Sequence, residues 1–461
     1  MTRSFVVLGG TGDLTGRLLL PGLAELVAAG ALAGPAAVVA VSREDWTDEE
    51  YRGWARDRLA EHAAHVPEEA RERLLGRLAY RQGDVTVPAD LRAGLERAGG
   101  VPVVYLALPN TVFLPTLEAL TEVGLPEGAV VAVEKPFGRN LADARQLNEV
   151  LHRLVPEEQV FRTDHFLAMQ TVLNILGLRF ANRVFEPVWN AQHVEQVEIV
   201  FDETLGLEGR AGYYDTAGAL RDMLQNHLLQ VLAVVAMEPP AALDAHGLAA
   251  RKADVLRAVR SPEDPRRDTV RARYTAGRVG ERELPDYAAE PGVHPDRGTE
   301  TYAEYTVQVE NWRWAGVPFR LRSGKALGAD RHEIVLRFRP VPHLVFGREE
   351  GEAHPEPDVL RLRLDPDAIS LEVNLNGAGD PFDLERRALA AELPPQALSA
   401  YGLLLGGLLD GEAALGISDV EAEESWRIVE PVLAAWAAGE VPLLEYPAGS
   451  DGPTPGHDQG T

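Results

Sequence analysis

Short apolar, β-branched runs alternate with helical patterns through the first third of this 461-residue chain. Strands separated by helices of this length are typical of a parallel sheet that helices cover on both faces. The sequence therefore predicts a doubly wound α/β domain with ligands at the carboxyl ends of its strands. The expected strands cover residues 4–10, 37–42, 101–109 and 129–133, and the expected helices cover 14–29, 47–64, 111–122 and 141–154.

The pattern changes after about residue 170, where strand-like segments follow one another with few helices between them. Several of these segments alternate polar and apolar residues, which indicates a large, mainly antiparallel sheet with one face in solvent or against a partner. We expect an α/β domain at 1–168, an α+β domain at 169–446 and a disordered tail at 447–461. The strand-like segments are 193–203, 269–276, 302–310, 333–339, 359–364 and 369–375, and helical patterns lie at 216–237, 395–409 and 420–438.

Composition excludes several kinds of chemistry. The chain has no cysteine, which rules out disulfides, thiolate catalysis and cysteine-ligated metal centres, and we expect no metal cofactor. Its formal net charge of −26 disfavours binding to nucleic acid or to anionic membranes. No apolar run approaches the length of a membrane span, and the first residues lack the features of a signal peptide. These observations favour a cytoplasmic protein.

Lysine stands at only three positions, Lys135, Lys252 and Lys325, and arginine supplies the other positive side chains. A chain so rich in arginine keeps an ammonium where a planar guanidinium cannot replace it, or by chance. Lys135 follows an apolar run in the sequence Glu-Lys-Pro-Phe-Gly, and Lys325 ends the sequence Arg-Ser-Gly-Lys. Both are candidate site residues.

A glycine-rich loop follows the first expected strand and leads into the first helix. Glycines there let the backbone approach a pyrophosphate, which the helix N-terminus stabilises, so the loop predicts a Rossmann-like dinucleotide site. Arg43, past the second strand, would meet the 2′-phosphate of NADP, but Glu44 and Asp45 would repel it. The choice between NADP and NAD therefore stays open. The loop residues are Gly9, Gly10, Thr11, Gly12, Asp13 and Leu14.

Two histidines lie beside carboxylates in promising places. Asp164 and His165 follow a strand-like run at the junction of the two expected domains, where ligand clefts commonly form. His227 lies on the helical pattern that also carries Asp222. A dehydrogenase without a metal needs a base for the hydroxyl proton, and an imidazole oriented by a carboxylate suits this near pH 7. Asp164 paired with His227 would supply that arrangement.

With these motifs together, the chain resembles the glucose-6-phosphate dehydrogenase family over nearly its whole length. The resemblance rests on the glycine loop and on segments 105–109, 134–138, 164–165, 209–215, 218–227, 322–325 and 424–427. The block from 212 to 227 is its most specific part. The resemblance implies oxidation of C1 of a glucose 6-phosphate by NADP or NAD. It also implies a homodimer, or a dimer of dimers, paired through the large sheet.

The resemblance also assigns roles to individual residues. It implies that His227 is the general base, that Asp164 supports it, and that Lys135 touches both substrate and nicotinamide beside a cis Pro136. The implied sugar ligands are Glu203, Asp222 and Lys325 for hydroxyls and His165 for a phosphate oxygen, and the implied cofactor ligands besides the loop are Arg43, Asp84, Val85 and Pro109.

The chain departs from the family where the sugar phosphate is held. Phe166 and Met169 stand where the family has a tyrosine and a lysine, so a hydroxyl and an ammonium are missing. A desolvated phosphate without its counter-charges is costly. Asp330 also stands where the family often has a basic residue, although Arg331 beside it could compensate, and Leu18 stands where the family commonly has a lysine near the cofactor. The substrate is then free glucose or a glucose whose C6 substituent is not a phosphate. Alternatively, Arg179 or Arg183 rebuilds the phosphate site from another direction.

Two further hypotheses compete with this one. An oxidoreductase of the inositol and glucose–fructose type also joins a dinucleotide fold to a Glu-Lys-Pro turn, but it lacks the 212–227 block. A catalytically silent sugar or dinucleotide sensor would explain the altered phosphate motif, but the intact His227, Asp164 and Lys135 argue against it.

Overall fold

The computed structural model of the chain describes residues 3–32, 37–209, 211–346, 355–379, 382–412 and 414–454. The chain groups into two compact units. Unit 1 contains Met1–Met169, Pro240–Ala253 and Gln396–Trp426, and unit 2 contains Gln170–Pro239, Asp254–Pro395 and Arg427–Thr461. The first border lies one residue after the expected one at 168. The expectation of a single boundary needs correction, because two later segments return to unit 1.

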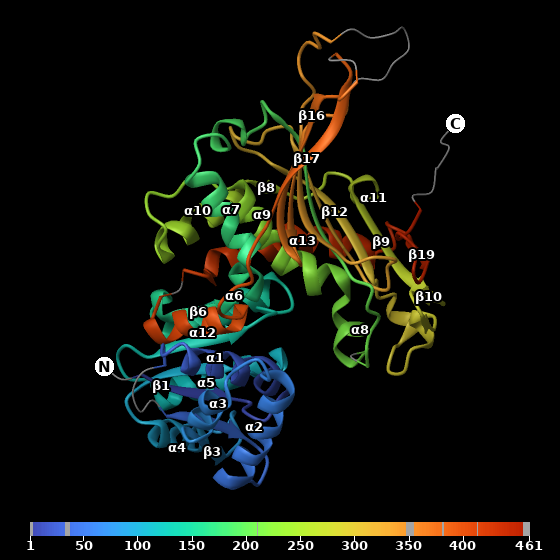
Figure 1. Ribbon diagram of the computed structural model, residues 1–461. Helices are drawn as coiled ribbons and strands as arrows, with labels where there is room; N and C mark the ends of the chain where they lie inside the picture. Colours follow the sequence, from blue (N-terminus) through green and yellow to red (C-terminus); the bar gives the residue numbers. More distant parts are fainter. Residues whose placement is uncertain are drawn as a thin grey trace. The chain divides into compact units, whose positions relative to one another are not determined.

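A seven-stranded sheet forms the centre of unit 1 (Figure 1). Its order is β18-β6-β5-β4-β1-β2-β3, and all neighbours are parallel except β18, which runs antiparallel to β6. The chain therefore builds outwards from β1 in one direction and from β4 in the other, as the strand–helix alternation predicts. The strands are β1 Arg3–Leu8, β2 Val38–Ser42, β3 Leu78–Gln82, β4 Val101–Leu106, β5 Val130–Glu134, β6 Val160–Thr163 and β18 Gly416–Ile417.

The connections of unit 1 are helical. The π-helix η1 Thr15–Leu19 leads into α1 Leu20–Ala28, and the later helices are α2 Asp48–His62, α3 Glu68–Leu75, α4 Pro88–Ala98, α5 Asn110–Val123 and α6 Leu141–Leu154, with the short η2 Glu157–Gln159 and η3 His165–Ala168. The sequence did not indicate α3, β3 and α4. Strand β3 ends in two exposed polar residues, which weakens its apolar signal.

Helix α12 Ala400–Asp410, far along the chain, packs on α1 in unit 1. Ser399 caps its first turn, and the Ser399 N–H donates to Glu25 at 2.8 Å. Tyr401 and Leu405 enter the same apolar core as α1. These contacts explain why a segment beyond residue 395 belongs to unit 1.

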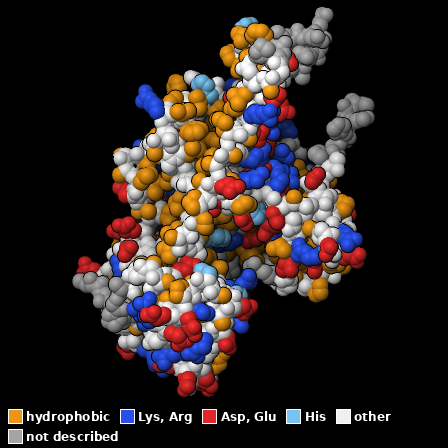
Figure 2. Space-filling model, viewed as in Figure 1, with side chains coloured by type: hydrophobic (Ala, Val, Ile, Leu, Met, Phe, Trp, Pro, Cys, Tyr) orange, Lys and Arg blue, Asp and Glu red, His pale blue; other side chains and the backbone are white. Residues whose placement is uncertain are grey.

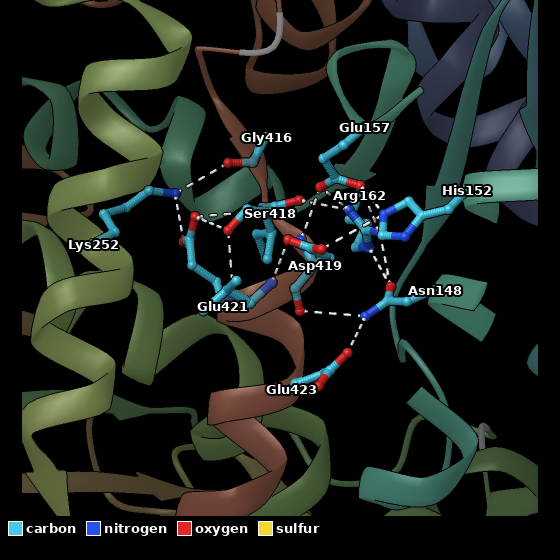
Figure 3. A network of polar contacts seen from close by, with 12 residues as sticks. Asn148, His152, Glu157, Arg162, Lys252, Gly416, Ser418, Asp419, Glu421 and Glu423 are labelled. Carbon is cyan, nitrogen blue, oxygen red and sulfur yellow. Dashed lines mark hydrogen bonds and ion pairs between the residues drawn. The ribbon is translucent and has the colours of Figure 1, made fainter. Parts of the chain in front are cut away.

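A polar network joins the two segments, 240–253 and 396–426, that return to unit 1 (Figure 3). Lys252 Nζ lies 2.9 Å from Glu421 Oε2, and both side chains are buried. The Lys252 ammonium also donates to the Gly416 carbonyl at 3.0 Å, and Ser418 Oγ donates to the other Glu421 oxygen at 2.9 Å. Lys252 is thus a structural lysine, which joins the α10 region to the start of α13. These helices are α10 Ala245–Ala258 and α13 Asp419–Ala437.

A ten-stranded sheet dominates unit 2, in the order β17-β16-β15-β14-β7-β13-β12-β9-β19, with β8 beside β12. It is mainly antiparallel, as expected, but β7 with β13 and β9 with β19 are parallel pairs. Figure 1 shows β16 and β17 as a long hairpin. The strands are β7 Val194–Asp202, β8 Val259–Arg260, β9 Thr269–Thr275, β12 Tyr302–Val309, β13 Pro318–Gly324, β14 Arg331–Phe338, β15 Val359–Leu364, β16 Asp367–Asn376, β17 Leu384–Glu392 and β19 Leu443–Pro447.

One face of this sheet is mainly apolar over its central strands, and the other carries a row of ion pairs. Figure 2 shows blue and red side chains side by side over these strands. Alternate residues of each strand supply them, as period-2 patterning requires. The closest pairs on this face are Arg320–Glu304 at 2.6 Å, Arg331–Glu333 at 2.7 Å, Arg361–Glu333 at 2.8 Å and Arg322–Asp202 at 2.9 Å.

The helical pattern at 216–237 is not one helix. Gly218 breaks the first part, α8 Ala211–Ala219, with a φ of +72° that suits glycine. A π-helix, η5 Leu220–Leu228, follows, and only then α9 Leu229–Ala236. The other elements of unit 2 are α7 Gln170–Phe180, α11 Pro265–Asp268, the hairpin β10 Gly277–Val279 with β11 Arg282–Leu284, and the short η4 Glu186–Val188, η6 Tyr287–Ala289 and η7 Pro295–Arg297.

The chain continues in ordered contacts past Pro447, which corrects the expectation of disorder from that residue. The Gly449 N–H donates to the Ala326 carbonyl at 2.8 Å, and the Asp451 carbonyl accepts from Arg322 at 2.9 Å. Residues 455–461 of the expected tail lie outside the described residues. Among the helices described, none combines the length and the apolar character that crossing a membrane would demand.

Candidate functional site

The glycine loop of unit 1 packs closely against the neighbouring strands at two positions that only glycine can occupy. Gly9 has a φ of +88°, and a Cβ built there would lie 2.3 Å from the Ala107 carbonyl oxygen. A Cβ at Gly10 would lie 2.3 Å from the Ala40 Cβ, so neither position tolerates a side chain without movement. The Gly12 N–H closes the turn by donating to the Gly9 carbonyl at 3.0 Å. The backbone between β1 and η1 therefore fits the dinucleotide loop that the sequence predicts.

Polar side chains gather beside this loop at the carboxyl ends of β2 and β3. Arg43 Nη2 donates to Asp84 Oδ2 at 3.0 Å, and both side chains are partly exposed. Two hydrogen bonds from Thr86, and then the Arg43 charge, hold the pKa of Asp84 below its ordinary value, although burial opposes them. Glu44 accepts from the Thr11 hydroxyl at 2.8 Å. The structure thus brings Arg43, Asp84 and Thr11 close together. It also gives the Glu44 carboxylate a hydrogen-bonding role beside the loop, whereas the sequence predicted only that Glu44 repels a 2′-phosphate.

The remaining cofactor candidates of unit 1 follow the same edge. Val85 is buried in the loop after Asp84. Pro109 precedes α5 after the end of β4, where parallel strand ends meet the loop after β1. Asp13 is an exposed residue of the loop, and Leu14 packs partly on the core. Every cofactor candidate therefore lies after a strand of one parallel sheet.

Lys135 follows β5 at this edge, and its peptide bond to Pro136 is cis. The neighbouring Glu134 is buried and accepts from the hydroxyls of Tyr105 and, at 3.2 Å, Tyr401. Burial raises the pKa of Glu134 despite these bonds. The tyrosines fix the backbone that presents Lys135. Tyr401 arrives from α12, so only the return of that segment completes this arrangement.

Asp164 and His165 follow β6, the next strand of the sheet. Asp164 caps η3 by accepting from the Phe166 N–H at 3.0 Å. The His165 ring stacks on Tyr401 at 5.8 Å and meets the Phe166 ring edge-on at 5.0 Å. Phe166 is buried, and Met169 follows at the end of η3. An aromatic ring without a hydroxyl therefore packs against the histidine that was expected to hold a phosphate.

Arg179 cannot serve as the replacement phosphate ligand. Its guanidinium is fully buried in unit 2 and donates to the carbonyls of Val235 and Met237 and to the Glu186 carboxylate. It also lies nine residues along α7 from Gln170, about 14 Å from the residue that follows Met169. Arg183 lies beyond the end of α7, further still along the chain. The alternative in which these arginines rebuild the phosphate site is therefore not supported.

In unit 2, Glu203 and Lys325 meet because β7 and β13 are parallel neighbours. The two strands end together, with Asp202 opposite Gly324, and each is followed by its candidate residue. Lys325 Nζ donates to Glu203 Oε2 at 2.6 Å. The same ammonium lies 5.4 Å from the centroid of the buried Tyr214 ring. The sequence reading missed Tyr214 as a site residue, although it lies in the specific block from 212 to 227.

Asp222 and His227 both lie on the π-helix η5. In an α-helix, five residues turn the chain about 500°, so the two side chains would stand about 140° apart. In a π-helix, hydrogen bonds run from i to i+5, so residues five apart lie much nearer to one side than in an α-helix, although they are not directly above one another. The two candidates therefore face the same side of η5. Tyr213 Oη donates to Asp222 at 3.2 Å. Burial raises the pKa of the Tyr214 hydroxyl most strongly, and the Asp222 charge is the next cause.

Neighbouring charges expected near Lys325 have other partners. Asp330 accepts from the Thr204 N–H at 2.6 Å and so anchors the residue after Glu203. The Arg331 guanidinium donates to Glu333. The expectation that Arg331 compensates for Asp330 is therefore not supported by its contacts.

The structure thus assembles two half-sites. Unit 1 brings together the glycine loop, Arg43, Asp84, Val85, Pro109, Lys135, Asp164, His165 and Met169 along one sheet edge or the segment after it. Unit 2 brings together Glu203, Lys325 and Tyr214, with Asp222 and His227 on the adjoining helix. Asp164 and His227 belong to different units, so their pairing remains an inference from the sequence.

Comparisons with known proteins cover both units. Residues 6–174 match the family model for the glucose-6-phosphate dehydrogenase NAD binding domain, and residues 176–459 match the model for the C-terminal domain of the same enzyme. A glucose-6-phosphate 1-dehydrogenase of Mycolicibacterium smegmatis is 39% identical, over 97% of this chain and 94% of that protein.

Solved structures agree. The crystal structure of a glucose-6-phosphate 1-dehydrogenase from Mycobacterium avium is 36% identical, with a TM-score of 0.86, and the match covers 98% of this chain and 95% of that one. A glucose-6-phosphate dehydrogenase in complex with its substrate glucose 6-phosphate has a TM-score of 0.88 at 29% identity, and the match covers 98% of this chain and 96% of that one.

Proposed function

Because the chain belongs to the glucose-6-phosphate dehydrogenase family, we propose that it oxidises C1 of β-D-glucose 6-phosphate, or of a close analogue, to the 1,5-lactone with NADP or NAD. The grouping of Lys325, Glu203 and Tyr214 beside the helix that carries His227 is the observation that supports this most directly. A carboxylate, an ammonium and a phenol suit a ligand rich in hydroxyl groups.

His227 is the proposed general base. Oxidation at C1 removes a hydride from carbon and a proton from O1, and the carbon–oxygen single bond becomes the lactone carbonyl. The neutral imidazole of His227 takes the O1 proton, and Asp164 orients the ring and stabilises the imidazolium. A nicotinamide dinucleotide held at the glycine loop would supply the hydride acceptor. Lys135, Glu203, Asp222 and Lys325 hold the substrate in place, since orientation of the reacting groups supplies much of the rate.

The glycine loop is the proposed pyrophosphate site, because its backbone leaves no room for side chains at Gly9 and Gly10. Arg43 is the ligand of a 2′-phosphate, but it already pairs with Asp84 and has Glu44 beside it. This pairing lowers the preference that Arg43 can give to NADP, so we propose that both cofactors are used.

Replacement of His227 by asparagine tests the mechanism. A positioned base contributes about 10²–10⁴-fold to the rate, so we expect kcat to fall by a comparable factor. NADPH binding, measured by fluorescence titration, should stay within about twofold of the wild type, because the change leaves the glycine loop intact. Unchanged turnover in this variant would falsify the assignment of His227.

The C6 group of the substrate is the open part of the proposal. Phe166 and Met169 replace a tyrosine and a lysine of the family, and Arg179 is committed elsewhere. We therefore favour two candidate substrates, glucose 6-phosphate and a glucose without a C6 phosphate. Values of kcat/KM for glucose 6-phosphate and glucose, each with NADP and NAD and followed at 340 nm, decide between them. No turnover with any sugar would instead favour the non-catalytic sensor.

A homodimer paired through the large sheet is the proposed assembly. One face of that sheet carries the ion pairs Arg320–Glu304 and Arg331–Glu333 over several strands. Light scattering coupled to size-exclusion chromatography should give about twice the chain mass of 50.2 kDa, or four times that mass for a dimer of dimers. A mass equal to one chain at micromolar concentration would contradict the proposal.

A further inference from the structure

A basic site separate from the candidate sugar ligands lies in unit 2, in a hollow of about 280 Å³. Three arginines from different elements line it: Arg221 from η5, Arg271 from β9 and Arg297 from η7. Thr216, Thr299 and Trp436 line it as well. This arginine hollow does not include the candidate sugar ligands Glu203, Asp222 and Lys325. Three guanidinium groups in one hollow make a locally positive region in a chain with a net charge of −26.

The guanidiniums keep donors for a ligand. Arg221 Nη1 makes one long hydrogen bond, 3.3 Å to the Ala217 carbonyl. Arg271 Nε donates to the Val441 carbonyl at 3.0 Å, and its guanidinium lies 5.7 Å from the Trp436 ring centroid. Arg297 Nη1 donates to Asp215 at 2.6 Å. Each arginine has five N–H donors, so these bonds to described residues leave most of them for a ligand.

Two carboxylates in the lining, Asp215 and Glu300, offset only part of this charge. Asp215 is fully buried and already accepts from Tyr287 Oη at 2.9 Å and the His294 N–H at 3.1 Å, besides Arg297. Glu300 is buried and accepts from the Leu220 N–H at 3.0 Å. Burial raises the pKa of Glu300, against the influence of that bond and of Arg221 and Arg271. Three guanidinium groups thus share the hollow with two carboxylates, which also accept hydrogen bonds from Tyr287, His294 and Leu220.

We propose that the arginine hollow binds a small oxyanion, which is inorganic phosphate or the phosphate group of a small metabolite. Guanidinium forks bind phosphate oxygens in pairs, and partial burial strengthens these charge-assisted bonds. Pockets for larger organic ligands measure about 300–1,000 Å³, so the hollow suits a compact anion rather than a dinucleotide. Because Arg221 directly precedes Asp222 on η5, the bound anion lies next to the helix that carries His227.

Titration calorimetry with inorganic phosphate, in a buffer without phosphate or sulfate, tests the proposal. The variant Arg271→Gln/Arg297→Gln should bind phosphate about 10–100-fold more weakly than the wild type, because two charge-assisted contacts are lost. Arg273→Gln is the matched control. Arg273 lies two residues along β9 outside the lining, where it pairs with Glu445 at 2.9 Å, and its loss should leave the affinity within about twofold.

Phosphate bound at the glycine loop of unit 1 would persist in every variant, so only the difference between variants counts. The proposal is overturned if the double variant binds phosphate as tightly as the wild type, or if Arg273→Gln weakens binding equally. Should the double variant fail to fold, Arg297→Gln alone replaces it, since that side chain is 45% exposed and Asp215 keeps two other donors. A parallel titration with glycerol 3-phosphate separates the sources, because tighter binding of the ester identifies a metabolite and tighter binding of phosphate identifies the free ion.

Discussion

At the level of single residues, we propose that Phe166 and Met169 determine which sugar the enzyme accepts. Met169 and Phe166 are chemically modest changes, since each keeps an apolar body of similar size and loses one polar group. In the proposed site each lost group would face the sugar phosphate, and a phosphate without counter-charges is expensive to desolvate. The structure removes the simplest compensation, because the Arg179 guanidinium is buried among carbonyls and Glu186.

Restoring a charge at Met169 tests this reasoning. Met169→Lys should raise kcat/KM for glucose 6-phosphate by about tenfold or more, because a hydrogen bond to a charged group contributes about 1.5–3 kcal/mol. The value for glucose should change little. Met169→Gln is the uncharged control with a side chain of similar length. Equal gains for both sugars, or an equal gain from glutamine, would contradict a role of position 169 in holding phosphate.

At the scale of helices and strands, strand pairing and helix type determine which candidate side chains lie close together. The parallel pairing of β7 with β13 makes Glu203 and Lys325 leave their strands at the same end. The π-helix η5 places Asp222 and His227 on one side, which an α-helix would not do. The polar network of Figure 3 fixes the start of α13 in unit 1, so changes in this network should alter the stability of the fold.

The buried ion pair Lys252–Glu421 should be costly to break. Lys252→Met leaves the buried Glu421 carboxylate without its counter-charge, and we expect a loss of about 3–5 kcal/mol in urea unfolding followed by circular dichroism. The double variant Lys252→Met/Glu421→Leu removes both charges and should recover much of that loss. Arg97→Met breaks the exposed pair with Asp48 and should cost at most about 1 kcal/mol. Equal effects of Lys252→Met and Arg97→Met would refute a structural role for Lys252.

Glu157 should make the same network sensitive to acid. Burial raises the pKa of Glu157, but the Arg162 charge and the hydrogen bonds from Arg162, the Asp419 N–H and His152 outweigh it, so the pKa lies below the ordinary 4.5. A carboxylate with a lowered pKa stabilises the folded state above the ordinary value, and this contribution is lost as the pH falls through the folded pKa.

Glu157→Gln should therefore destabilise the protein by about 1–2 kcal/mol at pH 7, with an allowance for its partial exposure. The difference from the wild type should shrink as the pH falls below about 4, because the wild-type carboxyl then becomes neutral. Thermal melting of both proteins between pH 3 and 7 measures this difference. A difference independent of pH would show that the charge of Glu157 contributes nothing.

At the scale of the whole molecule, the chain crosses between its two units several times. Residues 240–253 and 396–426 return to unit 1, where α12 packs on α1 and Tyr401 reaches both Glu134 and His165. The half-site that presents Lys135 is therefore built from segments more than 250 residues apart in sequence. A cut at the first domain border would remove α12 from unit 1 and expose its apolar core.

The doubly wound domain, the glycine loop and most strands of the large sheet could be predicted from the sequence, because periodic apolar patterns and glycine spacing are local signals. The same patterns did not reveal α3, β3, α4, β13 or β17, whose exposed faces carry polar residues. Three features became clear only in the folded chain. The helical pattern at 216–237 breaks at Gly218 and continues as a π-helix, Lys252 is structural, and the Arg179 guanidinium is unavailable to phosphate. These features depend on contacts with residues that are distant along the chain. The residue pattern of one segment does not show which distant residues will bury it.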